Sequence, residues 1–570
     1  MKFIYITLFL IFFLISCKSA KESIIYSDKL RFKKELSPLS KQTWYQKDYL
    51  QDSIPGISLD KWFYKMKPQS KSVIVAVIDT QIDLKHEDLQ GQIWTNPNEI
   101  RNNGIDDDKN GYIDDINGWS FTGTKSGGYV VWGNFEYTRV IRNWRQFFEN
   151  KTENQIDVLD LSNYKEYQRA VKMQEERIIY YNRWLQSIKH SVTVYPLIKD
   201  TLKYFFPKED YSYKQLDSLY KKYKINDKTY RQRREDNDKD LGALIDYRML
   251  SLESNENSLD DILENKAQID SIVNKNLNLN FNERTAIGDN PQKLEKGYGN
   301  NLVCNNKVGY RIIQDHCTKV SGILAANRKN NIGIKGIIQN VKIMPLSISY
   351  SGDENDKDIA MAVRYAVDNG AKIINMSFGK EFSLNKDWVF EAFKYAEENN
   401  VLLVHCAGNN GFNVDENPYY PSDNSFDRSK EVCSNFINVG SISSRLDSTF
   451  VSSFSNFGKQ NIDLFAPGEE IYTTSTGNTY VSDSGTSLAA PMVSGTAALI
   501  WSYYPKLTVT EVKQIILDSG TAYDLEVLVP GGEGKKVPFS ELSKSGKVLN
   551  VYNAMQLAEK VSNIKKHKTP

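Results

Sequence analysis

The sequence predicts an α/β fold in which a parallel β-sheet lies between layers of helices. Residues 71–78 form a short β-branched run that is typical of a buried parallel strand, and further strand-like runs lie at 341–349, 371–376 and 400–407. Amphipathic segments over residues 358–368 and 388–398 alternate with them, which is the pattern of βαβ units. The runs end in Asp, Ser, Gly and Asn, so we expect a functional site at the carboxyl ends of the strands.

Composition excludes several classes of protein. The 570 residues carry 72 Lys and Arg against 71 Asp and Glu, a net charge of +1, so the chain lacks the basic footprint of a nucleic-acid binder. Five cysteines, none in a C-x-x-C pair, are too few for a disulfide scaffold and argue against a zinc knuckle. The only long apolar run lies at the N-terminus, which excludes a polytopic membrane fold.

That apolar run predicts export. Residues 3–15 are apolar except for Thr7, which fits the core of a signal peptide and is too short to span a membrane comfortably. Leu14-Ile15-Ser16-Cys17 looks like a bacterial lipobox, in which Cys17 becomes the lipidated first residue. We therefore expect an exported protein that is lipid-anchored to a bacterial membrane, periplasmic or at the cell surface. An ordinary signal peptide or a short anchor is the alternative.

Residues 124–300 differ from the rest of the chain. Apolar residues there recur with three-four spacing, and Gln174 alone interrupts the series between Tyr164 and Ile188. The spacing predicts amphipathic helices that form a small bundle. A coiled-coil dimer or a membrane-lying helix is less favoured, because no strict heptad is sustained and the polar faces carry both charges.

Three short motifs contain the residues of a serine hydrolase triad. They are Val77-Ile78-Asp79-Thr80, Asp315-His316-Cys317-Thr318 and Ser484-Gly485-Thr486-Ser487-Leu488-Ala489-Ala490-Pro491. A hydroxyl at its free pKa is a poor nucleophile, so it needs an imidazole to take its proton and a carboxylate to orient that imidazole. With Asp79, His316 and Ser487 in this chain order, the chain resembles the subtilases, the subtilisin-like serine peptidases. The resemblance implies a subtilisin-like fold and hydrolysis of peptide bonds through an acyl-enzyme.

Each of these residues also has a plain structural explanation. Asp79 at a strand end can cap a helix, His316 can be a packing or surface residue, and Ser487 can be an N-terminal cap. The joint occurrence of three motifs in the family's order favours the catalytic assignment. A different serine hydrolase with the same triad is disfavoured, because peptide-binding edges accompany these motifs.

A fourth motif supports the assignment. Residues 401–411 predict a buried strand that runs into a tight turn and presents Asn409. The resemblance implies that the Asn409 amide binds the oxyanion, a role worth about 2.7–4 kcal/mol in subtilisin itself. The backbone N–H of Ser487 would be the second donor. A turn asparagine without a catalytic role is the alternative.

Two segments are expected to bind an extended polypeptide substrate. The first resembles the strand that walls the primary specificity pocket of subtilases, and the second would form the opposite edge. Aromatic residues in both suggest apolar subsites, and the preference for the residue before the scissile bond stays open. The expected binding residues are Ser377, Phe378 and Gly379 in the first segment and Ser349, Tyr350 and Gly352 in the second.

Two positions depart from the family pattern. Gln81 and Cys317 stand where the family has glycine. If either position has a positive φ, a side chain there costs about 1–2 kcal/mol, and a displacement of about 1 Å in the site can cost roughly 100-fold in rate. The sequence therefore leaves an alternative, a catalytically weakened subtilase-fold protein that acts as a surface binding module. Lys319 replaces a second family histidine, which affects packing more than chemistry.

Two loops are predicted to hold structural calcium, and no catalytic metal or organic cofactor is expected. The first loop alternates oxygen ligands with a glycine for the sharp turn, but its twelfth position is Asn117, so it is not an EF-hand. A solvated acidic turn is the alternative. The second resembles the stabilising calcium site of subtilases. The expected ligands are Asp106, Asp108, Asn110 and Asp114 in the first loop, and Asp88 with Asn331 in the second.

These patterns divide the chain into a signal peptide (1–17), a tether (18–43), two parts of one catalytic core (44–123 and 301–570) and a helical insertion (124–300). Asp79 and His316 lie 237 residues apart, whereas compact subtilases separate them by a few tens. The insertion falls in this gap, so we expect it to act as a lid or as an arm that binds a protein partner. The sequence thus predicts a membrane-anchored serine endopeptidase.

Overall fold

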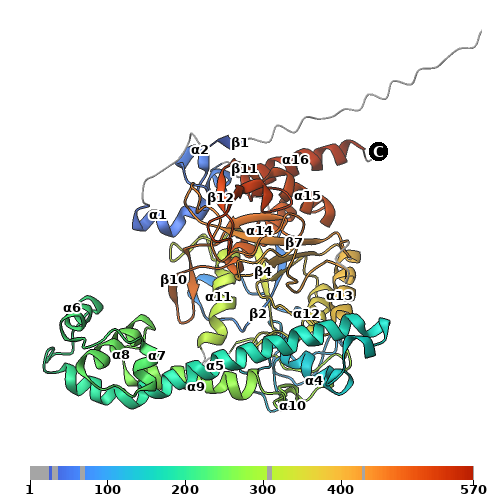
Figure 1. Ribbon diagram of the computed structural model, residues 1–570. Helices are drawn as coiled ribbons and strands as arrows, with labels where there is room; N and C mark the ends of the chain where they lie inside the picture. Colours follow the sequence, from blue (N-terminus) through green and yellow to red (C-terminus); the bar gives the residue numbers. More distant parts are fainter. Residues whose placement is uncertain (1–24, 28–35, 65–70, 305–310, 426–429, 569–570) are drawn as a thin grey trace, which may run out of the picture.

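A ten-stranded sheet forms the centre of the molecule (Figure 1). The structure is a computed structural model and describes residues 25–27, 36–64, 71–304, 311–425 and 430–568. The strand order is β1-β11-β14-β8-β7-β6-β5-β2-β4-β3, and every pair is parallel except β11 with β14. The predicted α/β class is therefore confirmed. The central strands are β2 (Val73–Asp79), β4 (Val341–Ser347), β5 (Ile373–Met376), β6 (Leu402–Cys406), β7 (Phe436–Ile442) and β8 (Leu464–Pro467).

Helices cover both faces of the sheet, as the side chains of β2 show. Val75 and Val77 belong to a core with the helices of one face, whereas Ala76 and Ile78 belong to a core with those of the other. Successive side chains of a strand point to opposite faces, so a run that is apolar throughout needs both layers. The first layer contains α11 (Arg311–Ala325), α14 (Thr486–Tyr503), α15 (Val509–Ser519) and α16 (Val551–Lys568), and the second contains α12 (Asp356–Asp368) and α13 (Lys386–Glu398).

Short elements complete the core. The N-terminal part differs from the plain tether predicted over residues 18–43, because β1 (Ile25–Ser27) pairs in parallel with β11 and α1 (Pro38–Thr43) follows. Residues 1–17, with Cys17, lie outside the described part of the chain. The other short elements are α2 (Tyr49–Asp52), α3 (Leu59–Phe63), β3 (Trp119–Ser120), β9 (Ile471–Ser475), β10 (Thr479–Asp483), β11 (Thr521–Asp524), β12 (Glu526–Leu528), β13 (Lys536–Pro538), β14 (Lys547–Val548) and 3-10 turns at Trp44–Gln46, Glu87–Leu89 and Phe539–Glu541.

The insertion is an elongated helical arm that crosses the sheet layers at the bottom of Figure 1 and projects to one side. Its longest helix, α5 (Leu161–Leu202), has 42 residues and is about 63 Å long at 1.5 Å per residue. Buried Gln174, which interrupts the apolar series, donates a hydrogen bond to the Leu277 carbonyl at 2.7 Å. The other helices are α4 (Glu136–Phe148), α6 (Tyr213–Tyr223), α7 (Tyr230–Glu235), α8 (Leu241–Glu253), α9 (Leu259–Ser271) and α10 (Arg284–Ile287), with 3-10 turns at Glu153–Gln155 and Val158–Asp160 and a π-helical turn at Ile272–Asn276.

Buried ion pairs join the arm to the core. Arg139 of α4 contacts Glu283 at 2.8 Å and Glu136 at 2.6 Å, and all three side chains are almost fully enclosed. Lys380, which follows β5, contacts Asp356 at 2.7 Å and Glu136 at 3.3 Å. Removing one partner from such a network leaves a buried charge without compensation, so these contacts fix the base of the arm against the core.

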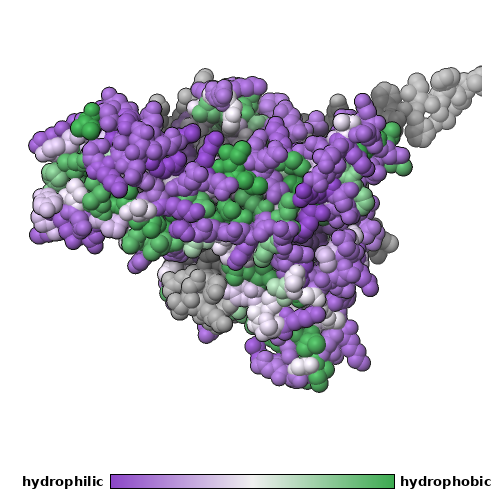
Figure 2. Space-filling model, turned by 60° about the horizontal axis from the view of Figure 1, so that its bottom comes forward, coloured by the Kyte–Doolittle hydropathy of each residue, from purple (hydrophilic) through white to green (hydrophobic). Residues whose placement is uncertain are grey.

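Hydrophilic side chains cover most of the face shown in Figure 2, and hydrophobic ones gather toward its middle. The described helices include none with the length and apolar character needed to cross a membrane. Cys317, Cys406 and Cys433 are buried free thiols in the described chain.

Candidate active site

The carboxyl end of β2 and the helix α11 bring Asp79 and His316 together. His316 Nδ1 lies 2.8 Å from Asp79 Oδ1 and 2.9 Å from Oδ2, and the Asp79 side chain is 1% exposed. The Thr80 backbone N–H also donates to Asp79 Oδ1 at 2.6 Å, which fixes the carboxylate. Burial lowers the pKa of His316, but the charge of Asp79 and its hydrogen bond outweigh this effect and raise the pKa above its ordinary value. The pair is therefore arranged to stabilise an imidazolium.

Ser487 begins the first turn of α14 and contacts the segment that follows β5. Its hydroxyl donates to the Ser377 carbonyl at 3.0 Å, and the Ser377 hydroxyl donates to the Ser487 carbonyl at 2.9 Å. Within the described structure the Ser487 hydroxyl thus has Ser377, and not His316, as its hydrogen-bond acceptor. Catalytic hydrogen bonds are often formed only when substrate is bound.

Asn409 follows β6 and is held by the residue before Ser487. Its side-chain oxygen accepts hydrogen bonds from the Thr486 backbone N–H and the Thr486 hydroxyl, both at 2.9 Å. Because the oxygen is engaged twice, the exposed amide nitrogen remains to donate to a ligand. Thr486 Oγ1 in turn accepts from the Gly408 N–H at 3.1 Å. Sequence reasoning missed this role of Thr486, although the residue stands inside the serine motif.

Gln81 and Cys317 are accommodated without backbone strain. Neither residue is among those with a positive φ. Gln81 is buried and donates through Nε2 to the Leu302 carbonyl at 2.9 Å. Cys317 lies within α11, and its N–H donates to the Thr80 hydroxyl at 3.1 Å. The sequence suggested a weakened site only if these positions required a positive φ, which favours glycine. The structure does not meet that condition.

Lys319 connects α11 with the β9–β10 hairpin. Its ammonium contacts Asp315 at 2.5 Å and Asp483 at 2.8 Å. Its positive charge lowers the pKa of nearby His316, whereas the charge of Asp483 raises it. Lys319 is therefore close enough to influence the proposed base electrostatically.

The segment after β5 keeps one free backbone edge. In the described chain, the N–H and C=O of Gly379 make no hydrogen bond. Phe378 is buried, with its carbonyl accepting from His405 Nε2 at 2.8 Å. The ring of Tyr419 fills the space between two glycines, because a Cβ on Gly379 would lie 2.3 Å from the ring and one on Gly408 would lie 2.5 Å from it. This space between Gly379 and Gly408, which we call the slot, is therefore shallow.

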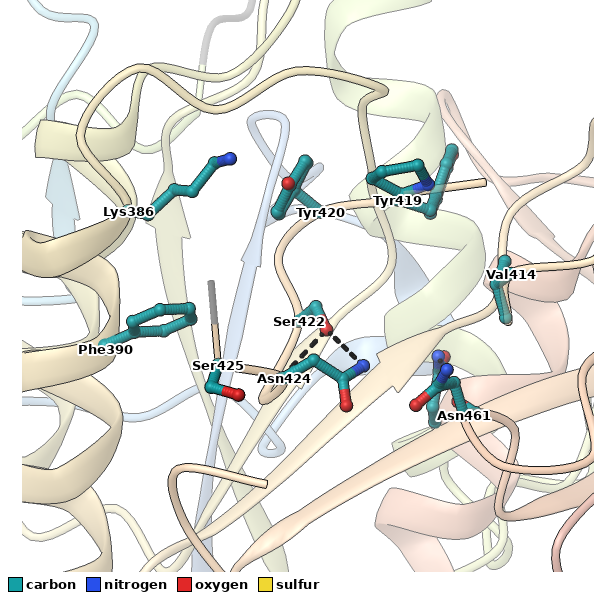
Figure 3. Close-up of a pocket in the computed structure, with 11 residues that line it drawn as sticks. Lys386, Phe390, Val414, Tyr419, Tyr420, Ser422, Asn424, Ser425 and Asn461 are labelled. Atoms are coloured by element: carbon teal, nitrogen blue, oxygen red, sulfur yellow. Dashed lines mark hydrogen bonds between the residues drawn. The ribbon is translucent and has the colours of Figure 1, made fainter. Parts of the chain in front are cut away.

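The backbone of Tyr420 anchors the loop that carries this ring. Tyr420 and Lys380 exchange two backbone hydrogen bonds, at 2.8 and 2.7 Å. Figure 3 shows a small cavity of about 30 Å³ on the same loop, with Tyr419, Tyr420 and Ser422 along its wall and Asn424 bonded to Ser422. Such a volume holds one or two water molecules and is too small for a substrate side chain.

The side chains of Ser349 and Tyr350 at the predicted opposite edge are enclosed, whereas the backbone groups of Tyr350 and Gly352 make no hydrogen bond in the described chain. Ser349 is buried and donates to Glu354 at 2.6 Å. The Tyr350 ring is 8% exposed, packs on Gly133, and its hydroxyl accepts from Arg139 at 2.6 Å. The next residue, Ser351, exchanges backbone hydrogen bonds with residues 131–133, and the Cα of Gly352 packs against the Gly133 carbonyl. Residues that flank the arm thus pair with Ser351 and cover the Tyr350 ring, so this side chain joins arm and core. Substrate binding by the backbone of Tyr350 and Gly352 stays a prediction.

The acidic loop gathers part of the predicted calcium ligands. Carboxylate oxygens of Asp106, Asp108 and Glu99 lie within 4.8 Å of one another, and Glu99 Oε2 is buried without a hydrogen-bond partner in the described structure. Asn110 lies beside them, and its amide donates to Asp108 at 3.2 Å. Asp114 is directed elsewhere, because both its oxygens accept from backbone N–H groups of residues 103 and 104. Hard oxygen ligands of this kind suit Ca²⁺. Glu99 was missed because it precedes the motif.

The second predicted calcium loop has a different arrangement. Buried Asp88 accepts hydrogen bonds from Asn330 Nδ2 at 2.7 Å and from the Ile334 N–H at 2.9 Å. Asn330, and not the predicted Asn331, therefore contacts Asp88, while Asn331 is exposed with a φ of 59°. Both Asp88 oxygens accept hydrogen bonds, and calcium binding at this loop stays a prediction.

Comparison with known proteins identifies the family. The model of the subtilase family matches residues 70–535. The chain belongs to the subtilases. A thermophilic serine proteinase of Bacillus sp. (strain AK1) is 36% identical over 211 residues, 37% of this chain and 47% of that protein. The major intracellular serine protease of Bacillus subtilis is 38% identical over 194 residues, 33% of this chain and 55% of that protein.

The sequence matches cover only part of this chain and only part of each similar protein. This chain spans about half the length of the two subtilases named above. Among solved structures, a protease from Pseudoalteromonas arctica is 26% identical, with a TM-score of 0.35, over 43% of this chain and 70% of that one.

Proposed function

We propose that this chain is a serine endopeptidase that hydrolyses peptide bonds of polypeptides through an acyl-enzyme. The observation that supports this most directly is the hydrogen-bonded Asp79–His316 pair at the carboxyl end of β2, in a subtilase fold that also presents Ser487 at the start of α14 and Asn409 after β6. A neutral His316 with Nδ1–H bound to Asp79 has Nε2 available as a proton acceptor.

The mechanism follows from these positions. Ser487 turns its hydroxyl from the Ser377 carbonyl to His316, attacks the scissile carbonyl and transfers its proton to Nε2. Asp79 keeps the imidazole in the correct tautomer and stabilises its positive charge. The Asn409 amide, oriented by Thr486, and the Ser487 N–H donate to the oxyanion. His316 then returns the proton to the leaving amine, and water repeats the sequence on the acyl-enzyme.

A fluorophosphonate probe tests this function. We expect covalent labelling of the purified protein, loss of labelling in Ser487→Ala, and unchanged labelling in Ser482→Ala, a matched control at an exposed serine of β10. Cleavage of a denatured protein should follow the same pattern. A folded protein that is neither labelled nor able to cleave would contradict the proposal and favour a binding module.

We further propose that Glu99, Asp106 and Asp108 bind a structural calcium ion, which would offset the repulsion among three clustered carboxylates. A ligand at 100 times its Kd stabilises a folded protein by about 2.7 kcal/mol. Calcium should therefore raise the thermal midpoint of the wild type but not that of Asp106→Asn. An equal response of both proteins would exclude this loop.

We also propose that Cys17 carries a lipid anchor and that the arm binds a protein partner at the membrane. The lipobox-like sequence supports the first point, and the length of α5 supports the second. Cells that produce the full chain should incorporate labelled fatty acid into it, and Cys17→Ser should abolish both incorporation and membrane fractionation. Unchanged fractionation of Cys17→Ser would contradict the anchor.

A further inference from the structure

A cavity of about 260 Å³ lies between the helical arm and the segment that follows β5. Arm residues that include Tyr137 and Tyr181 form one wall, and core residues Asp353 and Glu381 form the other. Gly379 also lines the cavity, two residues beyond Ser377, whose carbonyl accepts from the Ser487 hydroxyl. A peptide paired along the free edge of Gly379 therefore passes the mouth of this cavity.

The core offers little other space for a large side chain at this point. Tyr419 fills the slot between Gly379 and Gly408, and its ring also lines the cavity. Beyond the opposite edge the backbone is engaged by side chains, because the Asp353 carbonyl accepts from Arg139 at 2.8 Å and the Glu354 carbonyl accepts from Lys380 at 2.5 Å. A large substrate side chain thus finds little room in the slot. The cavity that the arm helps to build is the space that remains for it.

The walls of the cavity suit a cation. Neither Asp353 nor Glu381 has a salt-bridge partner in the described chain, and burial raises the pKa of both carboxyl groups. The Asp353 carboxylate accepts one hydrogen bond, from the Glu136 N–H at 2.7 Å. The enclosed Lys380 ammonium is engaged by Asp356 and Glu136, and its charge acts on Asp353 only from beyond salt-bridge distance. The rings of Tyr137, Tyr181 and Tyr419 add faces that attract cations.

Arg177 opposes this preference, together with the charges of Lys380 and Arg139 on Asp353 and that of Arg169 on Glu381. Arg177 lies on the exposed side of α5, lines the cavity and has no hydrogen bond or ion pair in the described structure. Its charge acts on both Asp353 and Glu381 from beyond salt-bridge distance. A cation that enters the cavity would share these carboxylates with Arg177, so the two charges should compete.

We propose that this cavity is a specificity pocket, walled by the helical arm, that binds a lysine or arginine side chain of the substrate on the amino-terminal side of the scissile bond. The inference rests on the proposed peptidase function. Glu381 supplies the charge that attracts the substrate cation, and Arg177 limits the attraction. Both are specificity residues that take no part in the bond-breaking steps.

The test uses the full chain and fluorogenic peptides that carry lysine, arginine, glutamine or norleucine at each of the four positions before the scissile bond. The wild type should prefer a basic residue at one of these positions by about tenfold or more in kcat/KM. Glu381→Gln should reduce that preference, and Arg177→Gln should increase it. Glu175→Gln and Lys172→Gln, at exposed positions of α5 that do not line the cavity, are matched controls and should leave it unchanged.

Two outcomes separate this inference from the peptidase function. Glu381→Gln and Arg177→Gln should label with the fluorophosphonate probe as fast as the wild type, because neither touches the triad. If wild-type protein labels and cleaves but shows no basic preference at any position, or if the two substitutions do not shift the preference in opposite directions, the pocket assignment is overturned and the peptidase proposal stands. If nothing labels or cleaves, both fail.

Discussion

His316 combines two opposing influences at the scale of a single residue. Burial lowers the pKa of His316, and the neighbouring Asp79 raises it. The net result is a pKa above 6.5, the ordinary value for histidine. A general base must be neutral, so kcat/KM should fall as the pH drops through a value above the ordinary histidine pKa. Lys319 restrains this increase, because its charge lowers the pKa of His316.

The substitution Lys319→Met should therefore move the acidic limb of the pH profile to higher pH. The lost cation and the freed carboxylates of Asp315 and Asp483 act in the same direction. We expect kcat/KM at pH 6, relative to that at pH 8, to fall several-fold, measured with one neutral peptide. Lys394→Met, at an exposed site of α13, is the control. A shift to lower pH in Lys319→Met would contradict the assignment of His316 as the base.

Tyr419 is a second residue whose role can be tested alone. Its ring fills the slot between Gly379 and Gly408, so the substrate residue that faces the slot should be small. Tyr419→Ala should open the slot and raise kcat/KM for a peptide with phenylalanine before the scissile bond by about tenfold, relative to one with alanine. Tyr420→Ala leaves the ring of Tyr419 in place and serves as the control. An unchanged ratio in Tyr419→Ala would show that this slot does not select the substrate.

The same residues show how far the sequence could predict the site. Asp79, His316, Ser487 and Asn409 stand in local motifs at strand and helix ends, so their grouping follows from the parallel sheet. The burial of Tyr350 could not be predicted, because Gly133 and Arg139, which cover it, lie more than two hundred residues away in the sequence. The position of Tyr419 likewise could not be predicted from its own sequence neighbours, because only the fold brings its ring between two glycines.

At the scale of elements, the strands were the most predictable part. β2, β5 and β6 are short β-branched runs that both helix layers cover, and this double burial makes the pattern continuous in the sequence. The arm was predictable as helices but not in its attachment. Buried charges make that attachment, and charged residues on an amphipathic helix are ordinarily expected to face solvent.

The attachment of α4 gives a prediction for stability. Arg139→Met would leave Glu283 enclosed without its cation and Glu136 with Lys380 alone, which should cost about 3–5 kcal/mol of unfolding free energy in guanidinium titrations. Arg145→Met breaks an exposed pair with Glu149, the residue that follows α4, and should cost far less unfolding free energy than Arg139→Met. Adding Glu283→Gln to Arg139→Met should restore part of the loss. Equal effects of Arg139→Met and Arg145→Met would show that the network does not hold the arm.

At the scale of the whole molecule, the arm has two parts with separate cores. The part next to the sheet packs Tyr137, Val140 and Tyr164 against Phe382 of the core. The distal part packs Val194, Leu216 and Leu244 among the helices α5, α6 and α8, without a residue from the sheet. The first part therefore belongs to the proposed pocket, and the second can change without disturbing it.

Removal of the distal part alone tests this division. The Tyr195 hydroxyl donates to the Asn257 carbonyl at 3.5 Å, so residues 196–256 start and end side by side and a linker of about six Gly and Ser residues can replace them. We expect kcat/KM for short peptides and fluorophosphonate labelling to stay within about twofold of the full chain, because the cavity near Gly379 keeps its walls. Binding or cleavage of a protein partner should change. A tenfold loss on short peptides would instead show that the distal part acts as a lid over the cleft.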